Sequence, residues 1–152
     1  VSGIFFSRAE EEGFIVVASQ QEVWTKEMAS EFYADHRGKP FFEDLVTYMT
    51  SGPVLKLCLE KADGIAAWRK LIGPSDPNQA KVENPTSIRA VFGTDGTKNT
   101  VHGSDSFASA VLEIGFCFPE PFQSERTLAL IKPGATELHS GKPLRVRVRV
   151  FT

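Results

Sequence analysis

The segment Asn99-Thr100-Val101-His102-Gly103-Ser104-Asp105-Ser106 carries more information about the fold and the chemistry of this chain than any other stretch. It places a histidine after a short apolar lead and before a small Gly-Ser pair, and a helix is predicted from Ser106 to Ile114. A helix N-terminus offers free N–H groups and a positive dipole end to an anion. Glycine leaves space for a substrate to approach closely. The pattern indicates a histidine nucleophile placed to meet a phosphate.

The segments on either side of this stretch alternate between helical and strand patterns. Helices are predicted over 1–12, 26–36, 41–49 and 65–72, and strands over 14–18 (extending toward Trp24), 54–59 and 127–131. The stretches 75–85 and 94–99 are polar and predict loops, and 116–118 predicts a short strand or extended segment. This alternation indicates the α/β or the α+β class.

The bulk composition excludes several function classes. With 152 residues and 41% hydrophobic residues, the chain predicts one soluble globular domain, and its net charge of −2 makes nucleic acid an unlikely partner. No apolar run approaches the roughly 20 residues that span a membrane, so no membrane partner is expected. Cys58 and Cys117 lie in apolar runs and predict buried free thiols in a reducing, cytoplasmic compartment.

Two arginines and two aromatic residues precede His102 at positions suited to a nucleotide. Arg69 and Arg89 each offer a fork of donors that matches phosphate oxygens. Tyr33 and Phe41 offer flat faces on which a base could stack. Together these side chains predict a nucleotide site with a phosphate-accepting histidine. His36 and His139 have no supporting partners in the sequence, and we expect both to be solvated.

With these residues and the segments around them, the chain resembles the nucleoside diphosphate kinases over roughly 4–119. The most specific match is 99–106, and Ser51-Gly52-Pro53 is a second, independent one. Further matches are 31–33, 39–42, 45–54, 68–73 and 87–89. The stretches 65–69 and 92–96 are most similar to the divergent, multi-domain members found in cilia and flagella, which adds the axoneme to the expected locations.

The resemblance implies the α+β class, as a ferredoxin-like βαββαβ sandwich whose antiparallel sheet is covered by helices. It also implies a ping-pong reaction that supplies nucleoside triphosphates. A nucleoside triphosphate such as ATP gives its γ-phosphate to His102, and the phosphohistidine passes it to a nucleoside diphosphate. The partners are therefore nucleoside tri- and diphosphates. Mg²⁺ is expected to arrive with the nucleotide, since no protein metal site is evident in the sequence.

The resemblance assigns catalytic roles to four residues. His102 is the nucleophile, and Glu113 holds its other ring nitrogen. Tyr33 and Ser104 position and tune the phosphoryl group.

Seven residues are implied to bind the nucleotide: Phe41, Leu45, Arg69, Ser75, Arg89, Asn99 and Lys132. Phe41 stacks on the base and Leu45 lines that slot, while the two arginines and the lysine hold phosphates. Ser75 stands where the family usually has threonine, which keeps the hydroxyl group. Asn99 contacts the sugar or the phosphate end.

The chain departs from the family pattern at its first strand. The family opens with a central strand that ends in Lys-Pro, whereas here the good copy of that strand is 127–135, at the other end. We therefore expect 1–119 to be a kinase-like domain without its usual first strand, and 120–152 to be a connector plus a strand. That strand either begins a second such domain or completes the first sheet, in its own chain or in a neighbour. An unfilled central slot would leave unpaired backbone groups in the core.

Two smaller departures concern the loop and the tail. The loop between Pro77 and Pro85 is about three residues longer than usual, and the tail that helps the family build hexamers is not recognisable. A neighbouring domain or a homo-oligomer is the expected partner instead. The alternating stretch 144–150 predicts an edge strand protected by arginines, or else a surface for an anionic partner.

These departures keep two other functions open beside the enzyme. One is a non-catalytic nucleotide-binding or architectural domain of an axonemal assembly. The other is a regulatory module that binds nucleotide without transfer. Whether Lys132 reaches the phosphates of the same site separates these alternatives.

Overall fold

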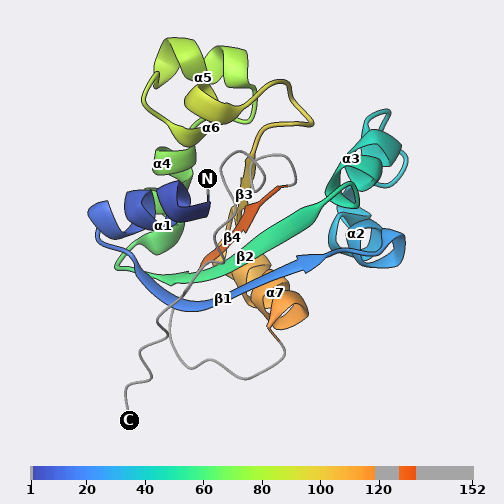
Figure 1. Ribbon diagram of the computed structural model, residues 1–152, viewed down its shortest axis with the longest axis horizontal. Helices are drawn as coiled ribbons and strands as arrows, with labels where there is room; N and C mark the ends of the chain where they lie inside the picture. The colour runs from blue at the N-terminus through green and yellow to red at the C-terminus, as the bar shows by residue number, and fades with distance from the viewer. Residues whose placement is uncertain (1, 119–126, 133–152) are drawn as a thin grey trace.

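Residues 2–118 and 127–132, which the computed structural model describes, fold around an antiparallel sheet (Figure 1). Its strands are β1 (Ile15–Val23), β2 (Pro53–Glu60), β3 (Val101–Gly103) and β4 (Thr127–Ile131). Their order across the sheet is β1-β2-β4-β3. Of these described strands, the last along the chain therefore lies inside the sheet, and β1 and β3 lie at its edges.

β4 lies between β2 and β3 and pairs with both of them. Leu57 of β2 is paired with Ala129, and His102 of β3 is paired with Leu130. All five residues of β4 are buried, which suits the apolar run Thr-Leu-Ala-Leu-Ile. When β4 is taken first, followed by α1 (Ser2–Glu11), β1, β2, α4 (Gly64–Ile72) and β3, the order reads βαββαβ. The predicted ferredoxin-like α+β fold is confirmed.

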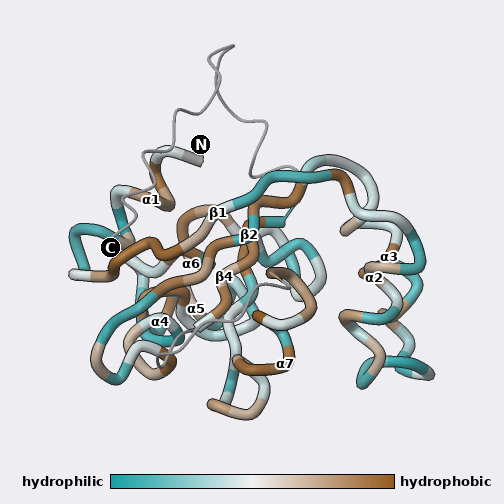
Figure 2. The backbone as a smooth tube through the Cα atoms, turned by 90° about the horizontal axis from the view of Figure 1, so that it is seen from below, coloured by the Kyte–Doolittle hydropathy of each residue, from teal (hydrophilic) through white to brown (hydrophobic). Residues whose placement is uncertain are grey.

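Alternating residues of the strands build two cores, one on each face of the sheet. On one face, Leu57 and Ala129 pack with Phe5 of α1 and Trp68 of α4. The opposite face packs against α2 (Lys26–Phe32), α3 (Phe42–Met49) and α7 (Phe107–Cys117), with Leu128 and Leu130 of β4 at its centre. Figure 2 shows the apolar character of β4 in the interior. His102 shares the face of Leu130, and so lies on the side of α2 and α7.

The stretch 75–85 is not the long loop that its polarity predicts. It contains α5 (Pro77–Glu83), which is followed by α6 (Ile88–Phe92). Pro77 stands at the first position of α5, and the Asp76 carboxylate accepts a hydrogen bond of 2.8 Å from the Asn78 N–H. This is the usual chemistry of a helix start, so the signal for this helix was present in the sequence.

Two further boundaries differ from the prediction. The helix expected over 26–36 ends at Phe32 and continues as a separate 3₁₀ turn, η1 (Ala34–His36). The predicted extended segment at 116–118 is wrong, because α7 continues through Cys117. The apolar residues there pack against the core from a helix rather than from a strand.

Cys58 and Cys117 are both buried, as predicted. Among the described residues, no helix has both the length and the apolar character needed to cross a membrane. The predictions for the connector 120–125, for His139 and for the strand 144–150 lie outside the described residues.

Candidate functional site

His102 is held by its backbone as well as by its ring. The indole N–H of Trp68, in α4, donates a hydrogen bond of 3.2 Å to the His102 carbonyl oxygen. A Cβ atom on Gly103 would lie 2.4 Å from the Trp68 side chain, so only glycine allows this approach. Trp68 is fully buried. The Trp68 side chain therefore connects β3, which carries His102, to α4, which also carries Arg69.

The imidazole of His102 is oriented by a short chain of polar groups. Glu113 of α7 lies with Oε1 3.0 Å from Nε2 of His102, and its Oε2 accepts a hydrogen bond of 2.6 Å from Ser104 Oγ. The Leu128 N–H of β4 donates to the same hydroxyl oxygen at 3.3 Å. A carboxylate can only accept, so a neutral imidazole must carry its proton on Nε2 and leave Nδ1 with a free lone pair. The predicted contact between Glu113 and His102 is present.

Aromatic rings form the wall beside the imidazole. The ring centroids of Phe32 and Tyr33 lie 5.3 and 6.2 Å from that of His102, and both rings are nearly perpendicular to it. Tyr33 is buried, and burial raises the pKa of its phenol well above the ordinary value, so the hydroxyl group stays neutral. Tyr33 was predicted from the sequence as a site residue, whereas Phe32 was not, because its only signal was its place immediately before Tyr33.

Lys132 reaches this site from β4. Its Nζ donates hydrogen bonds to Asn99 Oδ1 at 2.9 Å and to the Thr97 carbonyl oxygen at 3.3 Å, and lies 5.8 Å from the centre of the Tyr33 ring. Burial, reinforced by the charge of Arg89, lowers the pKa of Lys132 to about 7. The lysine is 5% exposed and forms no ion pair with a carboxylate in the described part of the chain.

Arg89 is the second buried cationic residue of this site. It donates to the carbonyl oxygens of Gly73 at 2.8 Å and of Val101 at 3.1 Å. Its Nε is buried and has no hydrogen-bond partner within the described ranges. Burial and the neighbouring charge of Arg69 lower its pKa to about 10, so the guanidinium stays charged at neutral pH.

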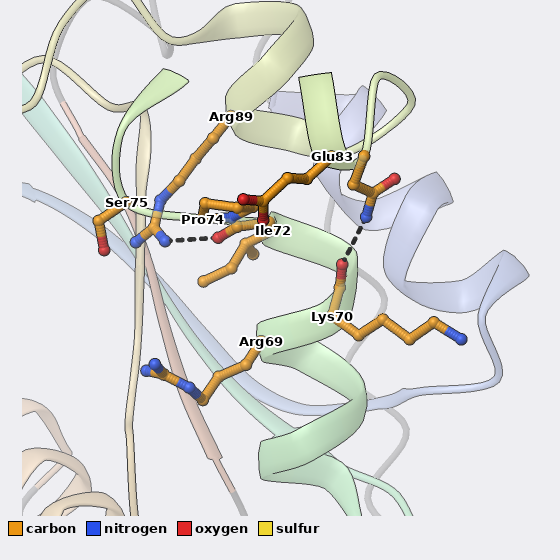
Figure 3. A pocket seen from close by; sticks show the side chains of 9 residues that line it. Arg69, Lys70, Ile72, Pro74, Ser75, Glu83 and Arg89 are labelled. Atoms are coloured by element: carbon orange, nitrogen blue, oxygen red, sulfur yellow. Dashed lines mark hydrogen bonds between the residues drawn. The ribbon is translucent and has the colours of Figure 1, made fainter. Parts of the chain in front are cut away.

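Three predicted nucleotide-binding residues line one cavity of about 310 Å³, at the end of α4. They are Arg69, Ser75 and Arg89. Figure 3 shows the two guanidinium groups extending to the same side of the chain, with Ser75 beside Arg89, whereas Lys70 points away from them. Asn99 joins this group because its Nδ2 donates to the Ser75 carbonyl oxygen at 3.2 Å.

The two predicted base-slot residues differ in exposure. Phe41 is 41% exposed just before α3, so part of its side chain is accessible to a ligand. Leu45 is 4% exposed and packs in the core cluster that includes Tyr33. His36 is half-buried, and the expectation that it has no supporting partners is wrong: its ring stacks on Tyr33 and lies against Phe41, and Lys39 Nζ is 3.0 Å from its Nδ1.

The arrangement combines a partly exposed imidazole with cations that have no described carboxylate partner. Like charges that approach one another are costly unless an anion joins them. The site therefore suits a polyanion beside a nitrogen nucleophile.

Known proteins with a similar sequence and structure identify the family of this chain. The family model of nucleoside diphosphate kinase matches residues 1–122. The chain is 51% identical over 110 residues to the probable nucleoside diphosphate kinase 5 of Arabidopsis thaliana, covering 72% of this chain and 76% of that protein. It is 36% identical over 118 residues to the mouse nucleoside diphosphate kinase homolog 7, covering 78% of this chain but only 30% of the mouse protein.

A solved structure extends the similarity to the fold. The nucleoside diphosphate kinase of Aquifex aeolicus superposes with a TM-score of 0.74 at 47% identity, covering 76% of this chain and 82% of the other. This chain belongs to the nucleoside diphosphate kinase family.

Proposed function

We propose that this chain transfers the γ-phosphate of a nucleoside triphosphate to a nucleoside diphosphate through a phosphohistidine at His102. One observation carries the proposal. The imidazole is oriented by Glu113 with Nδ1 as its free nitrogen, and the Tyr33 ring beside it also lies 5.8 Å from Lys132 Nζ. Lys132 and Arg89, which donates to the carbonyl oxygen of Val101 just before His102, are buried and have no carboxylate partner among the described residues.

In the first step, the lone pair on Nδ1 attacks the γ-phosphorus. The new N–P bond forms as the bond from the γ-phosphorus to the bridging oxygen breaks, and the electron pair leaves with the nucleoside diphosphate. The imidazole becomes cationic because both of its nitrogens are now substituted. The Glu113 carboxylate, 3.0 Å from Nε2, balances that charge. The second step is the reverse reaction with a different nucleoside diphosphate.

The cations act on the charge that develops on the phosphate oxygens. Lys132 and Arg89 are already ordered by hydrogen bonds to Asn99 and to backbone carbonyls. Fixed donors of this kind stabilise a transition state without having to reorganise. Arg69, exposed on α4, is the third donor on this side, and Ser75 adds a hydroxyl group next to Arg89 (Figure 3).

Mg²⁺ fits this site as a companion of the nucleotide. The described residues around His102 offer cationic and hydroxyl groups to the phosphates, with Glu113 already occupied by His102 and Ser104. The ion would neutralise part of the triphosphate charge when bound to its oxygens.

The test is a phosphohistidine assay. Incubation with γ-labelled ATP and Mg²⁺ should give acid-labile label on the protein, and a nucleoside diphosphate should remove it. Folded protein that binds ATP but takes up no label would contradict the proposal. That result would favour a nucleotide-binding or architectural domain, such as one in an axonemal assembly.

A further inference from the structure

Trp68 contacts β3 from the face of the sheet opposite to the His102 imidazole. Gly103 is paired with Ala129, and both Ala129 and Trp68 belong to the core on the side of α1 and α4. Because side chains alternate along a strand, a side chain on residue 103 would point into this core. The indole fills that space: an added Cβ would lie 2.4 Å from its Cδ1 and 2.7 Å from its Nε1. His102 is thus held through its imidazole on one face, by Glu113, and through its carbonyl oxygen on the other.

β3 depends on contacts from outside the sheet. It is three residues long, Val101–Gly103, and in the described sheet it lies at the edge, paired with β4 alone. So short a pairing contributes little stability by itself. The indole N–H of Trp68 adds a hydrogen bond of 3.2 Å, and the indole is itself fixed, since it is fully buried and meets the Phe14 ring edge-on at 5.8 Å.

Trp68 is also the residue before Arg69, which donates to the phosphates in the proposed mechanism. Both lie in α4, and Arg69 lines the same cavity as Ser75 and Arg89 (Figure 3). Because the indole binds the His102 carbonyl oxygen, a single side chain links the backbone of Arg69 to that of the nucleophile. The spacing of reacting groups matters closely: a misplacement of about 1 Å can cost about 10²-fold in rate.

We propose that Trp68 is a positioning residue for phosphoryl transfer: its indole N–H fixes the separation between His102, which accepts the phosphoryl group, and Arg69, which holds the phosphates. The inference rests on the proposed function, since it concerns the transfer of phosphate to His102. It predicts that loss of the indole N–H lowers the rate of transfer beyond any effect on stability.

The rate of His102 phosphorylation by γ-labelled ATP and Mg²⁺, measured in a single turnover of the whole chain, provides the test. Trp68→Phe keeps an aromatic ring and removes the N–H, and should lower this rate about tenfold. Trp24→Phe is the matched control, because Trp24 is also buried and its indole N–H also donates at 3.2 Å, but to Glu22. It should lower the thermal unfolding temperature to a similar extent and leave the rate at the parental value. Equal kinetic losses in the two variants would overturn the inference.

A double-mutant cycle separates positioning from a general structural role. In a chain that already carries Arg69→Ala, Trp68→Phe should lower the rate at most about twofold, because the guanidinium whose place it disturbs is absent. The same loss in both backgrounds would show that Trp68 does not act through Arg69, and would overturn the inference.

Gly103→Ala provides a second variant that leaves Trp68 and His102 in the chain. The added methyl group would collide with the indole and push β3 away from α4, so the rate should fall. Gly115→Ala is its control, because a Cβ at this exposed position of α7 meets no atom within 4 Å, and the rate should not change. If the parent is labelled, a parental rate in Trp68→Phe, or in Gly103→Ala where Trp68→Phe does not fold, would overturn the inference and leave the kinase standing. No label on the folded parent would refute the kinase and the inference with it.

Discussion

The two halves of the candidate site are assembled over different distances along the chain. His102, Ser104 and Glu113 all lie within 102–113: on β3, just after it, and on α7, respectively. The cationic half joins Lys132 to Asn99, 33 residues apart, and Arg89 to Gly73, 16 residues apart. The nucleophile is thus oriented by neighbours in sequence, whereas Lys132 joins the cationic half only because β4 enters the sheet. The chemistry of each half can be tested separately.

The largest effect is expected at the nucleophile. His102→Ala should lower phosphoryl transfer at least about 10⁴-fold, because the covalent intermediate of the proposed reaction forms on this imidazole. The side chain is partly exposed, so the thermal unfolding temperature should hardly change. Transfer at the parental rate by a folded variant would show that the reaction does not pass through His102.

A smaller effect is expected at the cation brought by β4. Lys132→Met should lower kcat about 10²- to 10³-fold while the sheet stays formed, since one fixed donor to the transition state is lost. Steady-state kinetics with ATP and a nucleoside diphosphate provide the measurement.

The chain offers a matched control for this substitution. Lys56 is an equally buried lysine, but it pairs with Glu22 at 2.6 Å and donates to the Cys117 carbonyl oxygen. Lys56→Met should lower stability and leave kcat near the parental value. If both variants lost kcat equally, the loss would come from removing any buried lysine and not from the position of Lys132 beside Asn99.

A still smaller effect is expected from Glu113→Gln. The amide oxygen can still accept from Nε2 of His102, but it cannot balance the cationic ring that forms on phosphorylation. We expect the rate of phosphohistidine formation to fall about 10- to 100-fold, measured by rapid quench in a single turnover. An unchanged rate would limit Glu113 to holding the ring in place.

The smallest effect is expected in the pH dependence of nucleotide affinity, which involves Lys132 in the cationic half. The pKa of Lys132 is about 7 in the free protein, and bound phosphates favour its charged form. Nucleotide binding should therefore take up a proton near and above pH 7. The affinity should fall as the pH rises above 7, by at most about tenfold per unit. Titration calorimetry in buffers of different ionisation enthalpy measures the uptake.

The nucleotide's own phosphates also titrate near neutral pH, so the informative quantity is the difference between variants. Lys132→Met should bind more weakly and show a shallower decline with pH. An identical pH dependence in the parent and in this variant would place the titrating group elsewhere.

The sequence by itself determined the parts of this protein that depend on short-range order. The Asn99–Ser106 stretch and the helix after it place a histidine, a serine and a glutamate together, because a strand followed at once by a helix leaves little freedom between them. The apolar run of β4 likewise predicted a buried strand. The helix α5 was missed although its capping residues were present, because its overall polarity outweighed that local signal.

Only the tertiary structure decided where β4 lies, and with it where Lys132 acts. An apolar strand must be buried between partners, but its sequence does not say which ones, since backbone hydrogen bonds are the same in every sheet. The same holds for Phe32, Trp68 and His36, which contact the site through rings and through an indole N–H. Their roles depend on distances across the fold, and no local pattern in the chain encodes those distances.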